Sequence, residues 1–257
     1  MVTCNICQNR SHKVFRHEVR GKYAVEYFLC DNCGFLQTES PFWIKEAYED
    51  PINLSDTGYV TRNVYLSRRA LIILYFLFDR QARFLDYAGG YGILTRLMRD
   101  YGLDFLWSDE YTPNLFARGF EFKGEDIEAV TCFECFEHFV DPLTEIKKIT
   151  AISKNILFST TLLPDPLPSP EAWDYYGFEH GQHVAFYSKK SLEHLARAHN
   201  LNFYTNGLNL HLFTPKPISD ILFKTLSLAS RFPMGRILRM FLESKMTSDS
   251  RRFSVSR

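Results

Sequence analysis

The sequence predicts an α/β fold in which a mainly parallel sheet is covered by helices on both faces. From residue 83 onward, short apolar stretches alternate with amphipathic ones, as strands alternate with helices in such folds. A turn of small residues at 88–92 joins the first strand to the first helix, which is typical of a parallel sheet that binds a ligand. A cysteine-rich segment precedes this region, and a basic, helical tail follows it.

The elements can be assigned in order along the chain. A helical stretch over about 62–78 comes first. The expected strands are 83–87, 104–109, 127–133, 154–160, 201–206 and 208–213, and the expected helices are 92–101, 142–151 and 189–199. Ser188 introduces the last helix, which carries Leu192, Leu195 and Ala196 on one face.

Length and composition limit the class of protein. The 257 residues suffice for one large domain with small appendages. The 30 Lys and Arg residues balance the 30 Asp and Glu residues, so the overall charge does not favour a nucleic-acid partner. The N-terminus shows no signal pattern, and the best apolar stretch, 70–78, is too short to span a bilayer. We therefore expect a cytoplasmic protein.

The turn after the first strand predicts a nucleoside-cofactor site. Backbone without side-chain bulk can approach a ligand closely, and the first N–H groups of the following helix face the bound molecule. An acidic residue at the end of the next strand is the usual partner of ribose hydroxyls. The expected cofactor-binding residues are Asp86, Ala88, Gly89, Gly90, Gly92, Asp109 and Glu134.

The six cysteines form three C-x-x-C pairs. Two of them, Cys4/Cys7 and Cys30/Cys33, can bring four thiolates around one tetrahedral Zn²⁺ and leave it no open position, which predicts a structural site. The third pair, Cys132/Cys135, lies where a strand ends, and we expect buried, inert thiols there.

The segment 162–188 is a long insertion rich in aromatic residues and contains two histidines. Loops of this length in a compact domain are usually functional, and the aromatic rings would suit stacking against a sugar. A histidine near neutral pH can accept a proton from an attacking oxygen or carbon nucleophile. We expect His183 to be the general base, with His180 as the second candidate.

The segment Glu134-x-x-Glu137-His138 supports an alternative chemistry. Two carboxylates and an imidazole, with His183 nearby, could hold Mg²⁺ or Mn²⁺, and the ion would lower the pKa of an attacking hydroxyl. In the other interpretation Glu137 and His138 bind no metal and shape the pocket.

Four segments together resemble one family: the cysteine pairs, the turn at 83–92, the stretch 133–142 and the stretch 181–188. They are similar to class I S-adenosylmethionine-dependent methyltransferases with an N-terminal zinc ribbon, found in bacterial sugar and polysaccharide biosynthesis. The resemblance implies a Rossmann-like sheet, S-adenosylmethionine as cofactor, and a sugar C-methyltransferase in which His183 is the base. Two positions depart from the pattern: Ala88 replaces the first motif glycine, and Gln182 replaces a glutamate.

The resemblance divides the chain into four segments: a zinc ribbon (1–40), a helical linker (41–80), a methyltransferase domain (81–214) and a tail (215–257). The segment from Glu134 to His138 is also similar to the metal site of RNA 3′-terminal 2′-O-methyltransferases. Three functions follow, in order of preference: a methyltransferase for a sugar or nucleotide-sugar, a metal-assisted O-methyltransferase for a diol of RNA or a small molecule, and a non-catalytic scaffold.

The tail has nine Lys and Arg residues against three Asp and Glu residues. Such a segment can pack on its own domain or contact an anionic membrane. We expect packing on the domain, with a frayed end at 247–257.

Overall fold

The structure is a computed structural model that describes residues 2–49, 56–232, 238 and 240–254. The chain forms two compact units. Unit 1 comprises residues 1–55, 134–154 and 158–217, and unit 2 comprises residues 56–133, 155–157 and 218–257. Residues 50–55 of the expected linker and 233–237, 239 and 255–257 of the expected tail lie outside the described residues.

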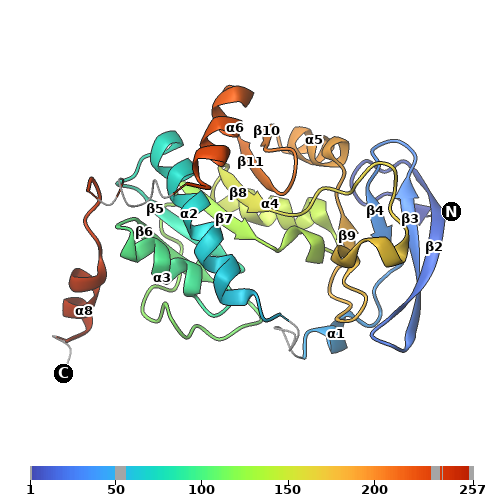
Figure 1. The fold of residues 1–257 in the computed structure, drawn as a ribbon, viewed down its shortest axis with the longest axis horizontal. Helices are drawn as coiled ribbons and strands as arrows, with labels where there is room; N and C mark the ends of the chain where they lie inside the picture. Colours follow the sequence, from blue (N-terminus) through green and yellow to red (C-terminus); the bar gives the residue numbers. More distant parts are fainter. Residues whose placement is uncertain (1, 50–55, 233–237, 239, 255–257) are drawn as a thin grey trace. The chain divides into compact units, whose positions relative to one another are not determined.

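Unit 1 contains an antiparallel sheet with the strand order β1-β2-β3-β4-β9, whose N-terminal strands are blue in Figure 1. The strands are β1 (Val2–Thr3), β2 (Arg10–Val19), β3 (Tyr23–Cys30), β4 (Leu36–Thr38) and β9 (Ala185–Phe186). The last strand comes from the long insertion, because Leu36 pairs with Phe186 and Gln37 with Ala185. The cysteine-rich segment thus shares its sheet with residues far along the chain.

The insertion at 162–188 is more regular than the sequence suggests. It contains β9 and two 3-10 turns, η2 (Pro170–Ala172) and η3 (Asp174–Tyr176). Tyr176, Phe186 and Tyr187 are almost fully buried, the first two in a core with Tyr27 and Trp43. The expectation that the loop aromatics stack on a sugar is therefore wrong for these three side chains, since their rings are needed for packing.

The two longer helices of unit 1, α4 and α5, begin with the caps that their sequences provide. In α4 (Pro142–Ile152) the Asp141 carboxylate accepts from the Thr144 N–H, and Pro142 is at the first turn. In α5 (Lys189–Ala198) the Ser188 hydroxyl accepts from the Ser191 N–H. The remaining elements are α1 (Ile44–Ala47), η1 (Phe136–His138), β10 (Asn202–Thr205) and β11 (Leu210–Thr214).

Unit 2 is built around three parallel strands. The strand β5 (Arg83–Tyr87) lies between β6 (Asp104–Ser108) and β7 (Ala129–Phe133), with Leu85 paired to both Leu106 and Val130. Phe84 and Leu85 are fully buried, as central strands require. The helices are α2 (Tyr59–Leu77), α3 (Ile93–Asp100), α6 (Asp220–Ala229) and α8 (Met246–Ser254).

The predicted α/β class is confirmed, but the sheet is mixed. Its strand order is β10-β11-β8-β7-β5-β6, where β8 is Ile156–Ser159. The strands β10 and β11 are antiparallel, with Tyr204 opposite Leu212. A short turn joins them, and a turn of that length can connect only antiparallel neighbours.

The C-terminal end is more ordered than expected. Residues 246–254 form α8, and the Asp249 carboxylate binds two arginines of α3. It accepts from Arg99 Nε at 2.8 Å, from Arg99 Nη2 at 2.7 Å and from Arg96 Nη2 at 2.7 Å. Frayed structure was therefore the wrong prediction here, because a buried acid anchors the helix. No helix in the described part of the chain has both the length and the apolarity to cross a membrane.

Candidate functional site

The turn after β5 has a backbone that favours glycine. Ala88, Gly90 and Gly92 have φ angles of 55°, 54° and 86°, in the left-handed region. This region is accessible to glycine without penalty and is strained for alanine. Ala88 thus occupies a position where the motif normally has glycine for a physical reason.

The three glycines also leave no room for a side chain. A Cβ at Gly89 would lie 2.7 Å from Oδ2 of Asp86, and one at Gly90 would lie 2.2 Å from Oη of Tyr59. At Gly92 the nearest atom would be Cβ of Ala117, at 2.9 Å. The turn is therefore fixed by close packing as well as by its dihedral angles.

The Asp86 carboxylate stabilises this turn through its hydrogen bonds. It is only 2% exposed, and its oxygens accept from the hydroxyls of Thr95 (3.0 Å) and Thr131 (3.2 Å). Burial raises the pKa of Asp86 to about 7, despite those two hydrogen bonds. A carboxylate in this position holds β5, β7 and α3 in place and has little surface left for a ligand.

Asp109 directly follows β6 and reaches the turn. Its Oδ2 accepts from the Gly90 N–H at 2.9 Å, and its Oδ1 accepts from the N–H groups of Tyr111 and Thr112 at 2.8 Å. A carboxylate offers about four lone pairs, so one remains for a hydroxyl group of a ligand. This geometry suits the expected contact with ribose.

Tyr59, which the sequence reasoning missed, lies over the same turn. Its hydroxyl oxygen accepts from the Tyr91 N–H at 3.2 Å. Burial raises the pKa of Tyr59, and the carboxylates of Asp86 and Asp109 add to the effect. The residue stands 31 positions before Gly90, at the start of α2, and no local pattern connects the two positions.

A second cluster lies in unit 1. One ligand atom from each of Glu137, His138 and His183 lies within 4.8 Å of the others. The expected metal set of Glu134, Glu137 and His138 is thus changed in one member, with His183 in place of Glu134. Glu134 is held elsewhere: the Ser159 hydroxyl donates to its Oε1 at 2.5 Å and accepts from its N–H at 2.8 Å.

Glu134 has a strained backbone. Its φ of 49° is in the left-handed region, like that of Ala88. Each residue directly follows a parallel strand, Ala88 after β5 and Glu134 after β7. Strain of this kind is frequent at ligand sites, where the surrounding structure enforces it.

The two histidines of the insertion differ in which nitrogen is available. Nδ1 of His183 is 2.6 Å from the carbonyl oxygen of Tyr175, so in the neutral ring Nδ1 carries the proton and Nε2 carries the lone pair. Nδ1 of His180 accepts from the Gln182 N–H at 3.1 Å. In neutral His180 the proton is therefore on Nε2, and the acceptor nitrogen Nδ1 already accepts the Gln182 N–H.

Glu137 is fully buried. Neither of its carboxylate oxygens accepts a hydrogen bond of ordinary geometry from the described residues, although the hydroxyls of Tyr175 and Thr160 are near. Burial, and to a smaller extent the charge of Glu134, raise the pKa of Glu137 to about 8. Such a group is stable either protonated or bound to a cation.

Gln182 has a structural role. Its side-chain amide donates to the Ala47 carbonyl oxygen at 2.8 Å, and the Trp43 indole N–H donates to the Gly181 carbonyl oxygen at 2.8 Å. Glutamate could not donate this bond when ionised. Gln182 therefore suits this site, because its amide can donate the hydrogen bond to the Ala47 carbonyl oxygen.

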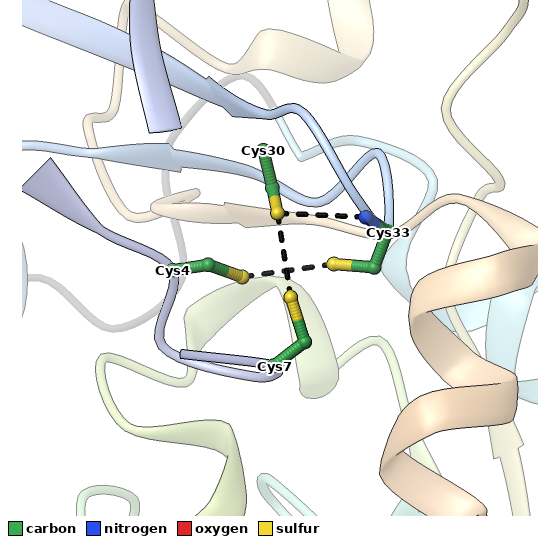
Figure 2. Close-up of side chains that lie close together, drawn as sticks. All are labelled: Cys4, Cys7, Cys30 and Cys33. Atoms are coloured by element: carbon green, nitrogen blue, oxygen red, sulfur yellow. Dashed lines mark hydrogen bonds between the residues drawn. The ribbon is translucent and has the colours of Figure 1, made fainter. Parts of the chain in front are cut away.

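The four N-terminal cysteines converge as predicted from their spacing (Figure 2). The sulfurs of Cys4 and Cys33 are 3.6 Å apart, and those of Cys7 and Cys30 are 3.4 Å apart. Tetrahedral Zn²⁺ with bonds of about 2.3 Å requires sulfurs about 3.8 Å apart, so the four residues fit the ion. The Ile6 N–H points to Cys4 Sγ and the Cys33 N–H to Cys30 Sγ, as is usual for thiolate ligands. Cys132 and Cys135 are buried free thiols.

Comparison with known proteins identifies the family. A family profile described as a methyltransferase domain matches residues 62–206, more than half of the chain. The chain belongs to this methyltransferase family. The prediction of a class I S-adenosylmethionine-dependent methyltransferase is confirmed, whereas the sugar acceptor stays a prediction. No curated protein matches the sequence significantly.

Solved structures of similar fold are methyltransferases of low sequence identity. CalO1 of calicheamicin biosynthesis, with S-adenosylhomocysteine bound, is 14% identical with a TM-score of 0.44 over 67% of this chain and 61% of CalO1. A possible histamine N-methyltransferase from Thermotoga maritima is 14% identical with a TM-score of 0.48, over 68% of this chain and 100% of that one. The magnesium protoporphyrin IX methyltransferase of Synechocystis is 13% identical with a TM-score of 0.42, over 66% of this chain and 92% of that one. The chain thus spans less than two thirds of CalO1, and 44% of OxaC, a structure with sinefungin and meleagrin bound.

The contact between Gly90 and Tyr59 predicts a coupling that can be measured. Gly90→Ala should destabilise the protein through both its left-handed backbone and the clash with the Tyr59 hydroxyl. In a Tyr59→Phe background the clash is removed, because Cζ of the ring would be 3.4 Å from the new Cβ. We expect the loss in free energy of unfolding to shrink by about 1–3 kcal/mol in a double-mutant cycle by urea denaturation.

Gly124→Ala is the matched control. Gly124 has a φ of 99° and no atom within 4 Å of its added Cβ, so this substitution reports the backbone penalty alone. Its cost should not depend on Tyr59→Phe. Equal costs of Gly90→Ala in both backgrounds would show that Tyr59 does not occupy the turn.

Proposed function

We propose that the protein transfers a methyl group from S-adenosylmethionine to a small polyhydroxylated acceptor, a sugar or nucleotide-sugar, and that His183 is the general base. The tautomer of His183 carries the proposal. Its Nδ1–H donates to the Tyr175 carbonyl oxygen, so the neutral ring has its lone pair on Nε2, the nitrogen that can take a proton from the acceptor.

The turn at 88–92 is the proposed site of the donor. S-adenosylmethionine supplies the methyl group on a sulfonium, and the chain must hold its ribose and its amino-acid part. We propose that Asp109 binds the ribose hydroxyls and that the backbone at Ala88, Gly89 and Gly90 lies against the molecule, with Glu134 as a further contact. Asp86 and Gly92 keep the turn in shape.

The proposed function first predicts that the protein binds the methyl donor. Isothermal titration calorimetry should show binding of S-adenosylmethionine and S-adenosylhomocysteine at micromolar concentration but no binding of NADH. Asp109→Ala should weaken binding by about tenfold or more, because a charge-assisted hydrogen bond is lost. Glu110→Ala, at the next position, is the control and should bind normally. Failure of both nucleosides to bind the folded protein would exclude the proposed function.

The second prediction concerns the base. With S-adenosyl-[methyl-¹⁴C]methionine and a panel of UDP- and dTDP-sugars as acceptors, His183→Ala should reduce methyl transfer by about 100-fold or more. S-adenosylhomocysteine binding should remain unchanged. His180→Ala is the matched control, and its loss of transfer should be much smaller. Normal turnover by His183→Ala, or an equal loss in both variants, would rule out His183 as the base.

A metal-assisted O-methyltransferase is the second candidate, favoured by the closeness of Glu137, His138 and His183. Carboxylate and imidazole suit Mg²⁺ or Mn²⁺, and the carbonyl of Tyr175 would orient His183 for Nε2 ligation. When bound, the ion would lower the pKa of an acceptor hydroxyl. The positive charge of the ion would then stabilise the buried carboxylate of Glu137.

The pKa of Glu137, about 8, gives this candidate a pH dependence. Below that pH the carboxyl group must lose its proton to bind an ion, so the affinity for Mn²⁺ should rise by up to about tenfold per pH unit and level off above pH 8. Calorimetry on zinc-loaded protein measures this affinity. Glu137→Gln should abolish binding, while Glu134→Gln should change it little. Full methyl transfer after EDTA treatment that leaves the zinc in place would exclude this candidate.

We also propose that Cys4, Cys7, Cys30 and Cys33 bind a structural Zn²⁺. Mass spectrometry of metals should find about one zinc per chain, and Cys4→Ser should lose it together with the thermal stability of unit 1. Cys132→Ser is the control and should keep its zinc, since Cys132 lies in β7. Zinc-free protein of unchanged melting temperature would contradict the proposal.

A further inference from the structure

The outward face of α6 is apolar although it is exposed to solvent. Ile221, Leu228 and Phe232 are 77%, 56% and 62% exposed, and Leu222 beside them is 44% exposed. Positions 221 and 228 are two helical turns apart within α6 and lie on one stripe, and Phe232 follows in the turn after the helix. Exposed apolar surface of this extent usually marks an interaction site.

The opposite face of α6 is already used for packing. Phe223, Leu226 and Ser227 are buried, and α6 contacts α2 within unit 2. The helix is therefore fixed by one face, and folding of the described residues leaves the other face uncovered. The outward residues do not serve the core of unit 2.

Cationic residues border this stripe. Lys224 and Arg231 are exposed; Lys224 lies on α6 one turn before Leu228, and Arg231 lies in the turn after the helix. Asp220 is the one acid within α6. Residues 220–232 hold Lys224 and Arg231 against Asp220, so this surface has a net positive charge whereas the whole chain has none.

We propose that the α6 surface, formed by Ile221, Leu222, Lys224, Leu228, Arg231 and Phe232, binds the surface of an anionic lipid bilayer. Its apolar stripe would enter the boundary between headgroups and acyl chains, while Lys224 and Arg231 contact anionic headgroups. The ten-residue helix is too short to span a bilayer, so it lies in the plane of the interface.

Charge favours a bilayer over a second copy of the chain. In a twofold dimer the same surface faces itself, which would bring Lys224 and Arg231 of both copies close together. An anionic membrane instead offers charge of the opposite sign. The enzyme would then act next to a membrane without being inserted in it.

Vesicle sedimentation of the full chain tests the inference. The protein should sediment with phosphatidylcholine vesicles that contain about one third phosphatidylglycerol, and it should stay in solution with pure phosphatidylcholine. Ile221→Asp/Leu228→Asp should reduce the bound fraction by about tenfold or more, and so should Lys224→Glu/Arg231→Glu. High salt should weaken the association.

Leu208→Asp is the matched control, because Leu208 is a comparably exposed leucine (58%) on the turn between β10 and β11. It should bind vesicles as the unchanged protein does. Melting temperature and S-adenosylhomocysteine binding show that each variant is folded, and these readouts do not depend on lipid. No sedimentation with anionic vesicles, or equal sedimentation of the α6 variants, would overturn the inference. A dimer in light scattering that Ile221→Asp/Leu228→Asp dissociates would also overturn it and assign the surface to self-association.

Discussion

The buried Asp86 carboxylate is the constraint on which the proposed donor site depends. It receives hydrogen bonds from Thr95 on α3 and Thr131 on β7, and it limits the space at Gly89 to a hydrogen atom. One side chain thus ties the central strand to its neighbouring strand and to the helix after the turn. Burial raises the pKa of Asp86 to about 7 and thus outweighs these two hydrogen bonds, so the carboxylate would be less stable still without its two hydroxyl donors.

In unit 1 the corresponding constraint is the carbonyl oxygen of Tyr175. It fixes the tautomer of His183, and the segment that carries both residues is anchored by Gln182 to Ala47 and by Gly181 to Trp43. These anchors belong to the N-terminal part of the chain. The same segment adds β9 to the N-terminal sheet. We infer that the N-terminal part of the chain, through Leu36, Trp43 and Ala47, holds the segment that carries His183 in position.

The sequence predicted what depends on local pattern. Strand 83–87 has the expected bounds, helix 92–101 is observed as Ile93–Asp100, and the four cysteines converge as their spacing implied. The errors involve partners that are distant in sequence. Tyr59 lies over Gly90, β9 pairs with β4, and Asp249 binds Arg99 across 150 positions. A periodic pattern shows that a side chain is buried or exposed, but it does not show which distant residue it contacts. The tail appeared frayed for that reason.

The same limit applies to the cluster around His183, because the sequence placed His183 near Glu134, Glu137 and His138 without showing which three of these four side chains meet. Spacing placed Glu134, Glu137 and His138 together, while the structure replaces Glu134 with His183 and assigns Glu134 to Ser159. This exchange makes the two candidate chemistries mutually exclusive. Nε2 of His183 has one lone pair, which can take a proton from the acceptor or bind a metal ion, but not both. If an ion occupies the cluster, the acceptor hydroxyl must lose its proton to another base. If no ion is bound, Glu137 stays protonated at neutral pH because of its raised pKa, and its buried carboxyl group can then donate a hydrogen bond. The protonation state of Glu137 therefore decides which chemistry the cluster can perform.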